Sequence, residues 1–147
     1  MTIITPQAAR GLALARTAET MLRTLGGVEV TVRFASPTTA SSAEFGLSVS
    51  SITDTPVEPV IVRASDARAL SVPHVREANV GNERGPEFLF SASSVQKAAL
   101  AGGYSSPVDW FTQSLGIFFN DLLHPIASVS TENFAGQSYL YRVTTNS

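Results

Sequence analysis

The sequence has no cysteine, which excludes disulfide bonds, thiolate metal sites and cysteine nucleophiles. Charge is also scarce, because Asp, Glu, Lys and Arg make up only 15% of the 147 residues, against about 25% in a typical domain. Serine and threonine take the place of the missing charges. A neutral surface rich in hydroxyl groups is easily buried against a partner.

Membrane and export signals are missing as well. No stretch reaches the roughly 18 consecutive apolar residues of a membrane span. Residues 1–21 lack the apolar core and the cleavage site of a signal peptide. Together with the absence of cysteine, this predicts a soluble protein that is made in a reducing cytoplasm and has no membrane partner.

Positive charge is too sparse for a typical free nucleic-acid binder. Ten basic residues stand against twelve acidic ones, for a net charge of −2, and no clustered basic face of the kind such binders carry is evident. All basic residues except Lys97 are arginine. Arginine suits interfaces because its planar guanidinium pairs and stacks with little loss of hydration, although a GC-rich genome produces the same bias.

Catalytic and ligand-binding motifs are also lacking. His74 and His124 have no second histidine or carboxylate at metal-ligand spacing. The stretch GLSVS resembles a nucleophile elbow, but Ser50 stands where that motif requires glycine. Residues 81–85, GNERG, have no strand–loop–helix context for phosphate binding. We therefore expect no enzyme, no cofactor and no metal.

Residues 5–26 have the pattern of an amphipathic helix. Thr5 is a favourable N-cap, Pro6 suits the first helical position, and two glycines end the helix at 26 and 27. Apolar side chains recur at helical spacing, at Leu12, Ala15, Ala18, Leu22 and Leu25, with Leu14 and Met21 beside them. We expect this stripe to pack on the core, and the alternative is a stripe that binds a partner.

The segments after the helix alternate with the period of two that is typical of strands. Residues 28–34 predict a half-buried strand, and residues 47–52 and 60–64 predict two more. Residues 54–59 contain two prolines, which cannot donate hydrogen bonds to a strand ladder. We expect a turn or a sheet edge there.

Residues 65–115 are predicted to be a long insertion. Its first part, between residues 64 and 87, is a connection of a length that is usually functional or mobile. Three elements are expected in the rest: a strand at 87–92, a helix at 93–102 capped by Ser93 or Ser94, and a helix at 106–115 capped by Ser106 with Pro107 in its first turn.

The C-terminal part returns to β-structure. Asn120 and Asp121 split two apolar runs and predict a tight turn, and residues 131–136 predict a second turn. In the final strand, residues 137–145, the side chains of Tyr139, Tyr141 and Val143 are expected on one face, with Leu140 and Arg142 on the other.

The aromatic pairs at 110–111 and 118–119 have two interpretations. Stacking platforms for single-stranded nucleic acid use aromatic side chains on strands, interleaved with basic residues. Residues 117–123 contain no basic residue, so core packing is favoured.

The C-terminal block resembles the end of the small head-closure (head-completion) proteins of long-tailed bacteriophages, in which the closing segment forms a hairpin. Residues 54–64 also look like the strand that follows a barrel loop in these proteins. The matching residues of the C-terminal block are Asp121, Leu122, Ile126, Val129, Gly136, Tyr139, Tyr141 and Val143.

The resemblance implies a small β-barrel that assembles as a ring, a hexamer or a dodecamer, in the neck of the virion. Such a ring lies between the portal or adaptor and the tail proteins, and it helps to retain packaged DNA. Ring contacts are heterologous and must close on themselves, which suits broad neutral surfaces. The neighbouring roles are a tail-terminator, which is α/β and also forms a ring, and a mainly helical adaptor.

We therefore predict one α+β domain over residues 1–147, a small antiparallel β-barrel or sandwich with an N-terminal helix. Its β-core is expected at 28–64 and 116–145. Arg68, Arg76 and Arg84 are the candidate contacts to a partner, or to packaged DNA in the channel, and the alternative is a solvated loop. A monomeric β-barrel that binds a ligand or nucleic acid is the runner-up from another functional class.

Overall fold

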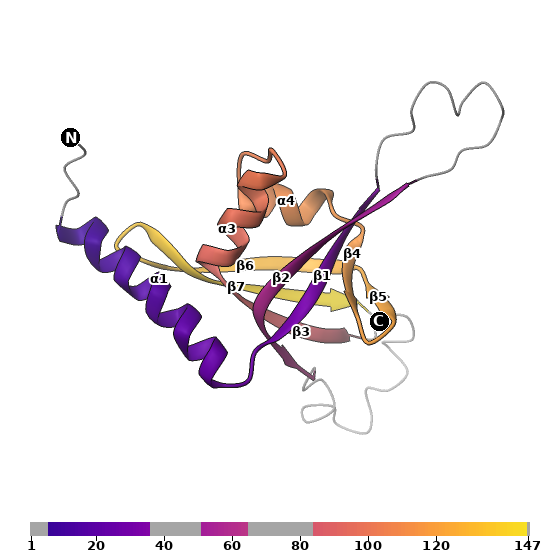
Figure 1. The fold of residues 1–147 in the computed structure, drawn as a ribbon, viewed down its shortest axis with the longest axis horizontal. Helices are drawn as coiled ribbons and strands as arrows, with labels where there is room; N and C mark the ends of the chain where they lie inside the picture. Colours follow the sequence, from indigo (N-terminus) through magenta and orange to yellow (C-terminus); the bar gives the residue numbers. More distant parts are fainter. Residues whose placement is uncertain (1–5, 36–50, 65–83, 147) are drawn as a thin grey trace, which may run out of the picture.

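The computed structural model describes residues 6–35, 51–64 and 84–146 (Figure 1). Seven antiparallel strands form one sheet in the order β5-β4-β1-β2-β3-β7-β6, and the described residues also form three helices. The elements in chain order are α1 (Pro6–Thr24), β1 (Val28–Ala35), β2 (Ile52–Arg63), β3 (Arg84–Ser91), α3 (Ala92–Ala101), α4 (Pro107–Gln113), β4 (Gly116–Phe119), β5 (Leu122–His124), β6 (Ile126–Phe134) and β7 (Gln137–Asn146).

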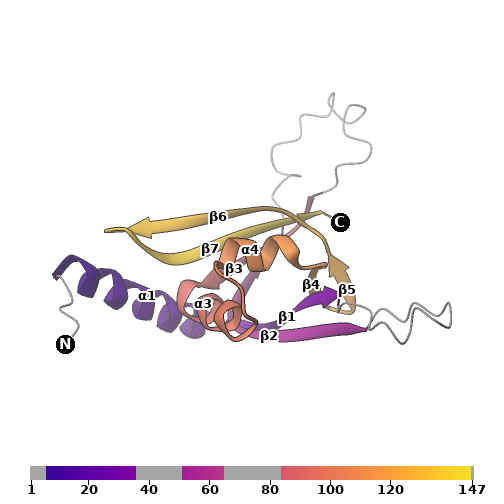
Figure 2. The ribbon, with the colours of Figure 1, turned by 90° about the horizontal axis from the view of Figure 1, so that it is seen from above.

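The α+β class and the N-terminal helix are confirmed, but the prediction of a barrel or sandwich is wrong. In the described part of the chain, β5 and β6 lie at opposite edges of a single sheet and do not pair with each other. Figure 2 shows the sheet curving around α3 and α4, which lie between β2 and the β6–β7 hairpin. These helices bury the apolar face that the opposite wall of a barrel or a second sheet would cover.

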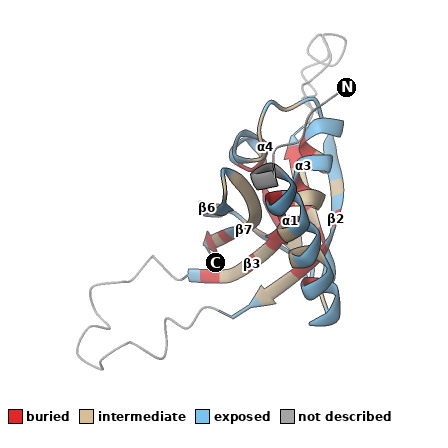
Figure 3. Cartoon of the chain, turned by 90° about the vertical axis from the view of Figure 1, so that its left-hand side faces the viewer, coloured by how far each residue is buried: buried red, intermediate tan, exposed pale blue. Residues whose placement is uncertain are grey.

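One face of the sheet carries the core. Phe88 and Phe90 of β3 are fully buried there, together with Phe111 of α4. The ring centroid of Phe111 lies 5.1 Å from that of Phe90 and 5.0 Å from that of Trp110. Figure 3 shows the buried residues in the strands and in α3, whereas the outer surface of α1 is exposed. We call this the covered face of the sheet, and the opposite one the open face.

Helix α1 packs mainly on β7, and also on β2 and α3. Gly11 makes the approach to β7 close, because a Cβ atom at this position would lie 2.6 Å from the Cβ of Gln137. Ala15 and Leu22 are buried, but Met21 and Leu25 of the predicted apolar stripe are 58% and 70% exposed. The stripe packs on the core along a narrower face than its sequence indicates. Thr5, the predicted N-cap, lies outside the described residues.

None of the helices in the described ranges is long and apolar enough to cross a membrane.

Strand β1 is confirmed, and β2 continues through the two prolines that predict a turn or an edge. From Val57 to Val60, β2 spans one residue more than the facing stretch of β1, so a bulge forms at Glu58 and Pro59. The pairing of β2 with β3 begins only at Val60. Before that point β2 has no second neighbour among the described strands, so the edge interpretation was right. The strand predicted at 47–52 lies almost wholly outside the described residues.

Residues 84–115, expected as part of an insertion, supply the middle of the sheet and its helical cover. β3 pairs with β2 on one side and with β7 on the other. The N-cap of α3 is Ser91, without a side-chain capping bond, rather than Ser93 or Ser94. The helix starts earlier because β3 runs into it directly. Gly102 ends α3 as predicted.

The C-terminal hairpins are confirmed. Asn120 and Asp121 have φ angles of 50° and 61° in the turn between β4 and β5, which is the conformation of a tight hairpin turn. The turn between β6 and β7 is shorter than predicted and consists of Ala135 and Gly136. In β7, Tyr141 and Val143 are buried on the covered face and Arg142 is exposed on the open face.

Candidate functional site

A groove of about 510 Å³ lies between α4 and the start of β6. Helix α4 forms as the sequence predicts, with Pro107 in its first turn and the backbone N–H of Asp109 donating to Ser106 Oγ at 3.2 Å. Val108 and Leu115 line the groove and are 44% and 43% exposed. The sequence predicts these two on one helix face with Phe111, which is fully buried. Leu115 lies beyond the end of α4 at Gln113, so within the helix it is Val108 that extends the apolar face past the core.

The other wall of the groove is formed by residues 125–129. Ile126 pairs with Thr145, and Val129 pairs with Val143. Directly opposite residues of antiparallel strands share a face, and Thr145 and Val143 are buried, so Ile126 and Val129 stand on the covered face. The lining consists of apolar side chains and of the hydroxyl groups of threonine and serine. The lining carries no charged side chain, so the groove suits an uncharged occupant.

Strand β6 forms one edge of the sheet, and β7 is its only neighbour among the described strands. The strand has nine residues, whereas β5 at the other edge has three. Glu132 is the single charged residue in β6, the strand contains no proline, and the side chain of Phe134 is 50% exposed. Natural edge strands are commonly protected by charge, proline or short length. β6 has little of this protection, and the groove lies beside it.

The open face of the sheet carries ion pairs. Arg33 Nε lies 2.9 Å from Asp54 Oδ1, and Arg33 Nη2 lies 3.0 Å from Asp54 Oδ2. These hydrogen bonds lower the pKa of Asp54 below its ordinary value and raise the pKa of Arg33. The guanidinium also lies over the ring of Phe118, with 4.2 Å between its central carbon and the ring centroid. On the same face, Arg142 Nε lies 2.9 Å from Glu87 Oε1.

Both arginines of these pairs already have carboxylate partners. A phosphate group would have to displace Asp54 or Glu87 to bind them. The open face is therefore a poor cationic surface for nucleic acid.

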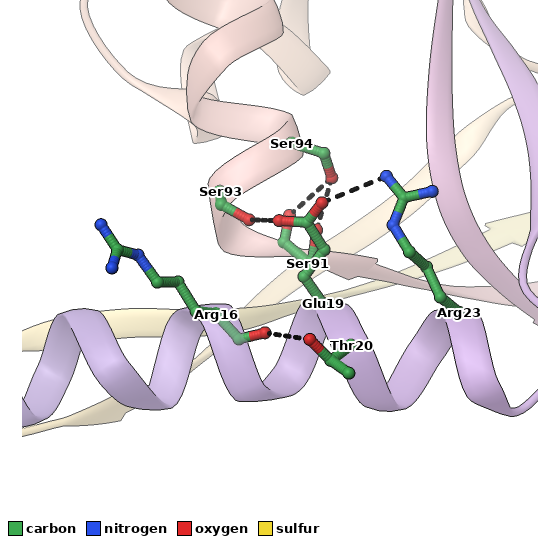
Figure 4. A network of polar contacts seen from close by, with 7 residues as sticks. All are labelled: Arg16, Glu19, Thr20, Arg23, Ser91, Ser93 and Ser94. Carbon is green, nitrogen blue, oxygen red and sulfur yellow. Dashed lines mark hydrogen bonds and ion pairs between the residues drawn. The ribbon is translucent and has the colours of Figure 1, made fainter.

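A polar cluster joins α1 to α3 (Figure 4). Ser93 Oγ donates to Glu19 Oε2 at 2.7 Å, and Arg23 Nη2 donates to Glu19 Oε1 at 3.1 Å. The hydrogen bond from Ser93 lowers the pKa of Glu19, with a further contribution from Arg23. Ser91 and Ser94 share a hydrogen bond of 2.6 Å beside it. The side chains of Glu19, Arg23 and Ser93 bond to one another, which makes the cluster a joint between two helices rather than a binding site.

Of the three candidate contacts named from the sequence, the structure describes Arg84 alone. Arg84 is exposed at the start of β3, whereas Arg68 and Arg76 lie outside the described residues. His74 and most of the GNERG stretch also lie outside them. His124 is half-buried in β5, and its ring centroid lies 6.0 Å from that of Phe88, so the imidazole packs beside the core.

The described ranges contain no group of three or more histidine, cysteine or acidic residues placed to hold a metal ion. Sequence reasoning missed the groove and the edge, which are the parts of the described surface with the clearest binding character. A signal was present in 126–134, because a long strand with one charge is unusual for a sheet edge. The position of that strand at the edge is not a local property of the sequence.

A scan against models of protein families finds no match to this chain. Searches of curated proteins and of solved structures find no match either.

Proposed function

We propose that this chain is a structural protein of the phage head–tail junction, which acts by assembling into a ring in the neck of the virion. The observation that carries the proposal is the amount of apolar side chain left on a weakly charged surface. Eleven large apolar residues of the described ranges are exposed, from 40% for Leu123 to 78% for Leu100. The buried centres of protein interfaces are depleted in charged residues, so such a surface is suited to association.

The resemblance to head-closure proteins adds the virion context. Its matching residues lie in the two C-terminal hairpins, with Gly136 in the turn between β6 and β7. That resemblance implies a closed barrel, however, and this sheet is open. The open sheet, with α3 and α4 on its covered face, favours the tail-terminator role, which is α/β and also forms a ring.

Direct binding of DNA as the main function has less support. Arg33 and Arg142 are paired with carboxylates on the open face, and the net charge is −2. Non-specific contact between the ring and packaged DNA, through Arg68, Arg76 or Arg84, stays part of the proposal.

The test is the mass of the purified chain in solution over a wide concentration range, with and without DNA, together with electron microscopy of the particles. The expected result is a closed ring of six or twelve copies, or a chain that ignores DNA and assembles only with portal, adaptor or tail proteins. A stable monomer that binds DNA with a steep salt dependence would contradict the proposal. That result would favour the monomeric binding domain.

A further inference from the structure

We infer that the contact between neighbouring copies of the proposed ring joins a basic face on α1 and α3 of one copy to an acidic pair on β1 and β2 of the next. The basic face consists of Arg10, Arg16 and Lys97, and the acidic pair consists of Glu29 and Glu58. This inference rests on the proposed function, because it names the two surfaces through which the ring closes. A ring uses two different surfaces of each copy, so surfaces of opposite charge suit it.

Charge is distributed unevenly over the described residues. Helices α1 and α3 carry four basic residues and one acidic residue, whereas the rest of the described chain carries four basic and seven acidic ones. The described surface therefore has two regions of opposite net charge. Such regions on two copies of one chain attract each other and orient the copies as they meet.

The cations of the basic face have no carboxylate partner in the part of the chain that the structure describes. The single carboxylate on α1 and α3 is that of Glu19, which is already bonded to Arg23 and Ser93. Figure 4 shows Arg16 and Arg23 extending from α1 on either side of Glu19. All three residues of the basic face are exposed, and none forms an ion pair with a described acidic residue. The face is therefore available to carboxylates of another molecule.

The acidic pair lies where β2 bulges. The bulge consists of Glu58 and Pro59, and the residue of β1 that faces it is Glu29, between the paired residues Val28 and Val30. Glu29 and Glu58 are both exposed, and neither forms an ion pair with a described basic residue. Like charges that stand opposite each other destabilise a strand pair. A cation from a neighbouring copy would offset this repulsion.

Exposed apolar side chains accompany both surfaces. Leu12 and Leu100 are exposed and lie one helical turn from Arg16 and Lys97, respectively. Val28 is exposed directly before the first residue of the acidic pair. Protein interfaces combine a buried apolar centre with a polar rim. Each of the two surfaces offers both parts.

A second copy of the chain is favoured over nucleic acid as the occupant of the basic face. Phosphate groups would neutralise the basic face, but the acidic surplus on the rest of the described chain would repel them. The acidic pair would also stay without a partner. A neighbouring copy neutralises both surfaces at once.

The test is sedimentation equilibrium of the full chain from about 1 µM to 1 mM, a range that brackets ordinary protein affinities. One variant reverses the basic face through Arg16→Glu and Lys97→Glu. The other reverses the acidic pair through Glu29→Lys and Glu58→Lys. Each variant is expected to weaken self-association by about tenfold or more, because like charges then meet across the contact.

Mixing the two variants separates a broken contact from a broken fold. In an equal mixture each reversed surface meets a surface of opposite charge, so association is expected to return. A variant with all four substitutions has the net charge of the unmodified chain and is expected to associate with itself. Gln113→Glu and Gln113→Lys add charge of either sign at an exposed position of α4, and both are expected to leave the association constant unchanged.

A ring that neither double variant weakens would overturn the inference and leave the proposed function standing. Variants that dissociate but do not reassociate on mixing would overturn it too, because the two surfaces then do not face each other. So would an unmodified chain that stays a monomer at every concentration. If reversal of the basic face abolishes binding of duplex DNA but leaves self-association unchanged, the face belongs to nucleic acid and the inference is wrong.

Discussion

The two faces of the sheet are built from the same strands but hold together by different means. On the covered face, Tyr141 and Val143 of β7 are buried among aromatic and aliphatic side chains. On the open face, Arg142 of the same strand forms an ion pair with Glu87. Burial of an apolar side chain contributes about 1.5–3 kcal/mol, whereas a surface ion pair contributes about 0–1 kcal/mol. Most of the stabilising free energy therefore comes from the covered face, and substitutions on the open face are expected to alter stability less.

The largest expected effect comes from Phe111→Ala. Phe111 is fully buried and lies between the rings of Phe90, Trp110 and Tyr141. Its removal leaves a cavity where α4 joins the sheet, so the free energy of unfolding is expected to fall by about 3–5 kcal/mol. Urea denaturation followed by tryptophan fluorescence measures it. A decrease in the free energy of unfolding of less than about 1 kcal/mol would mean that Phe111 of α4 is not packed in the core.

A matched pair within β7 sharpens the comparison of the two faces. Tyr141 is 4% exposed on the covered face, while its neighbour Leu140 is half-buried and points to the open face. Tyr141→Ala is expected to cost about 3 kcal/mol, and Leu140→Ala about 1 kcal/mol or less. Denaturation of both variants under the same conditions gives the difference. Equal losses would show that the register of β7 is wrong.

Thr145→Val tests a polar group on the covered face. Thr145 is 1% exposed, and its Oγ1 donates to the carbonyl oxygen of Pro86 at 2.6 Å. Valine keeps the shape but removes the donor, so the expected loss is about 1–2 kcal/mol. Thermal unfolding of the two proteins measures it. An unchanged melting temperature would mean that water or another donor replaces the hydroxyl group.

The smallest effect is expected from Asp54→Asn on the open face. The folded state holds the pKa of Asp54 below its unfolded value through the hydrogen bonds from Arg33. The contribution is therefore present above the unfolded pKa and is lost as the pH falls through the lower, folded pKa. At neutral pH the variant is expected to lose less stability than Thr145→Val, and high salt is expected to shrink the difference. A loss that is larger, or that persists at pH 2, would place the pair in the core.

The parts of the fold that local pattern determines were predictable. The period of 3.6 located α1, the period of two located β1 and β7, and the Asn120–Asp121 dipeptide located a turn. The cap of α4 was also predictable, because Ser106 followed by Pro107 is a local signal.

The open form of the sheet was not predictable in the same way. It depends on β3 pairing with β2 and β7 and on two helices that occupy the curved face. The alternation of β3 and β7 is equally compatible with a barrel, because it shows which residues are buried but not what covers them.

The candidate site was missed for a related reason. Val108 and Leu115 look like core residues on a helix wheel, and Ile126 and Val129 look like core residues on a strand. They line a groove between α4 and the start of β6, and this meeting of two distant segments is not visible in either local pattern. The predicted site residues came from loop composition instead, and Arg84 is the only one of them in the described ranges.

The packing of α1 on β7 joins the first and the last elements of the described fold. β7 also lies between β3 and β6, so three elements depend on it for a partner. While the chain is being translated, α1, β3 and β6 emerge from the ribosome without that partner. The fold is therefore completed only after β7 has emerged, and a nascent chain stalled before this point keeps its apolar surfaces accessible to chaperones.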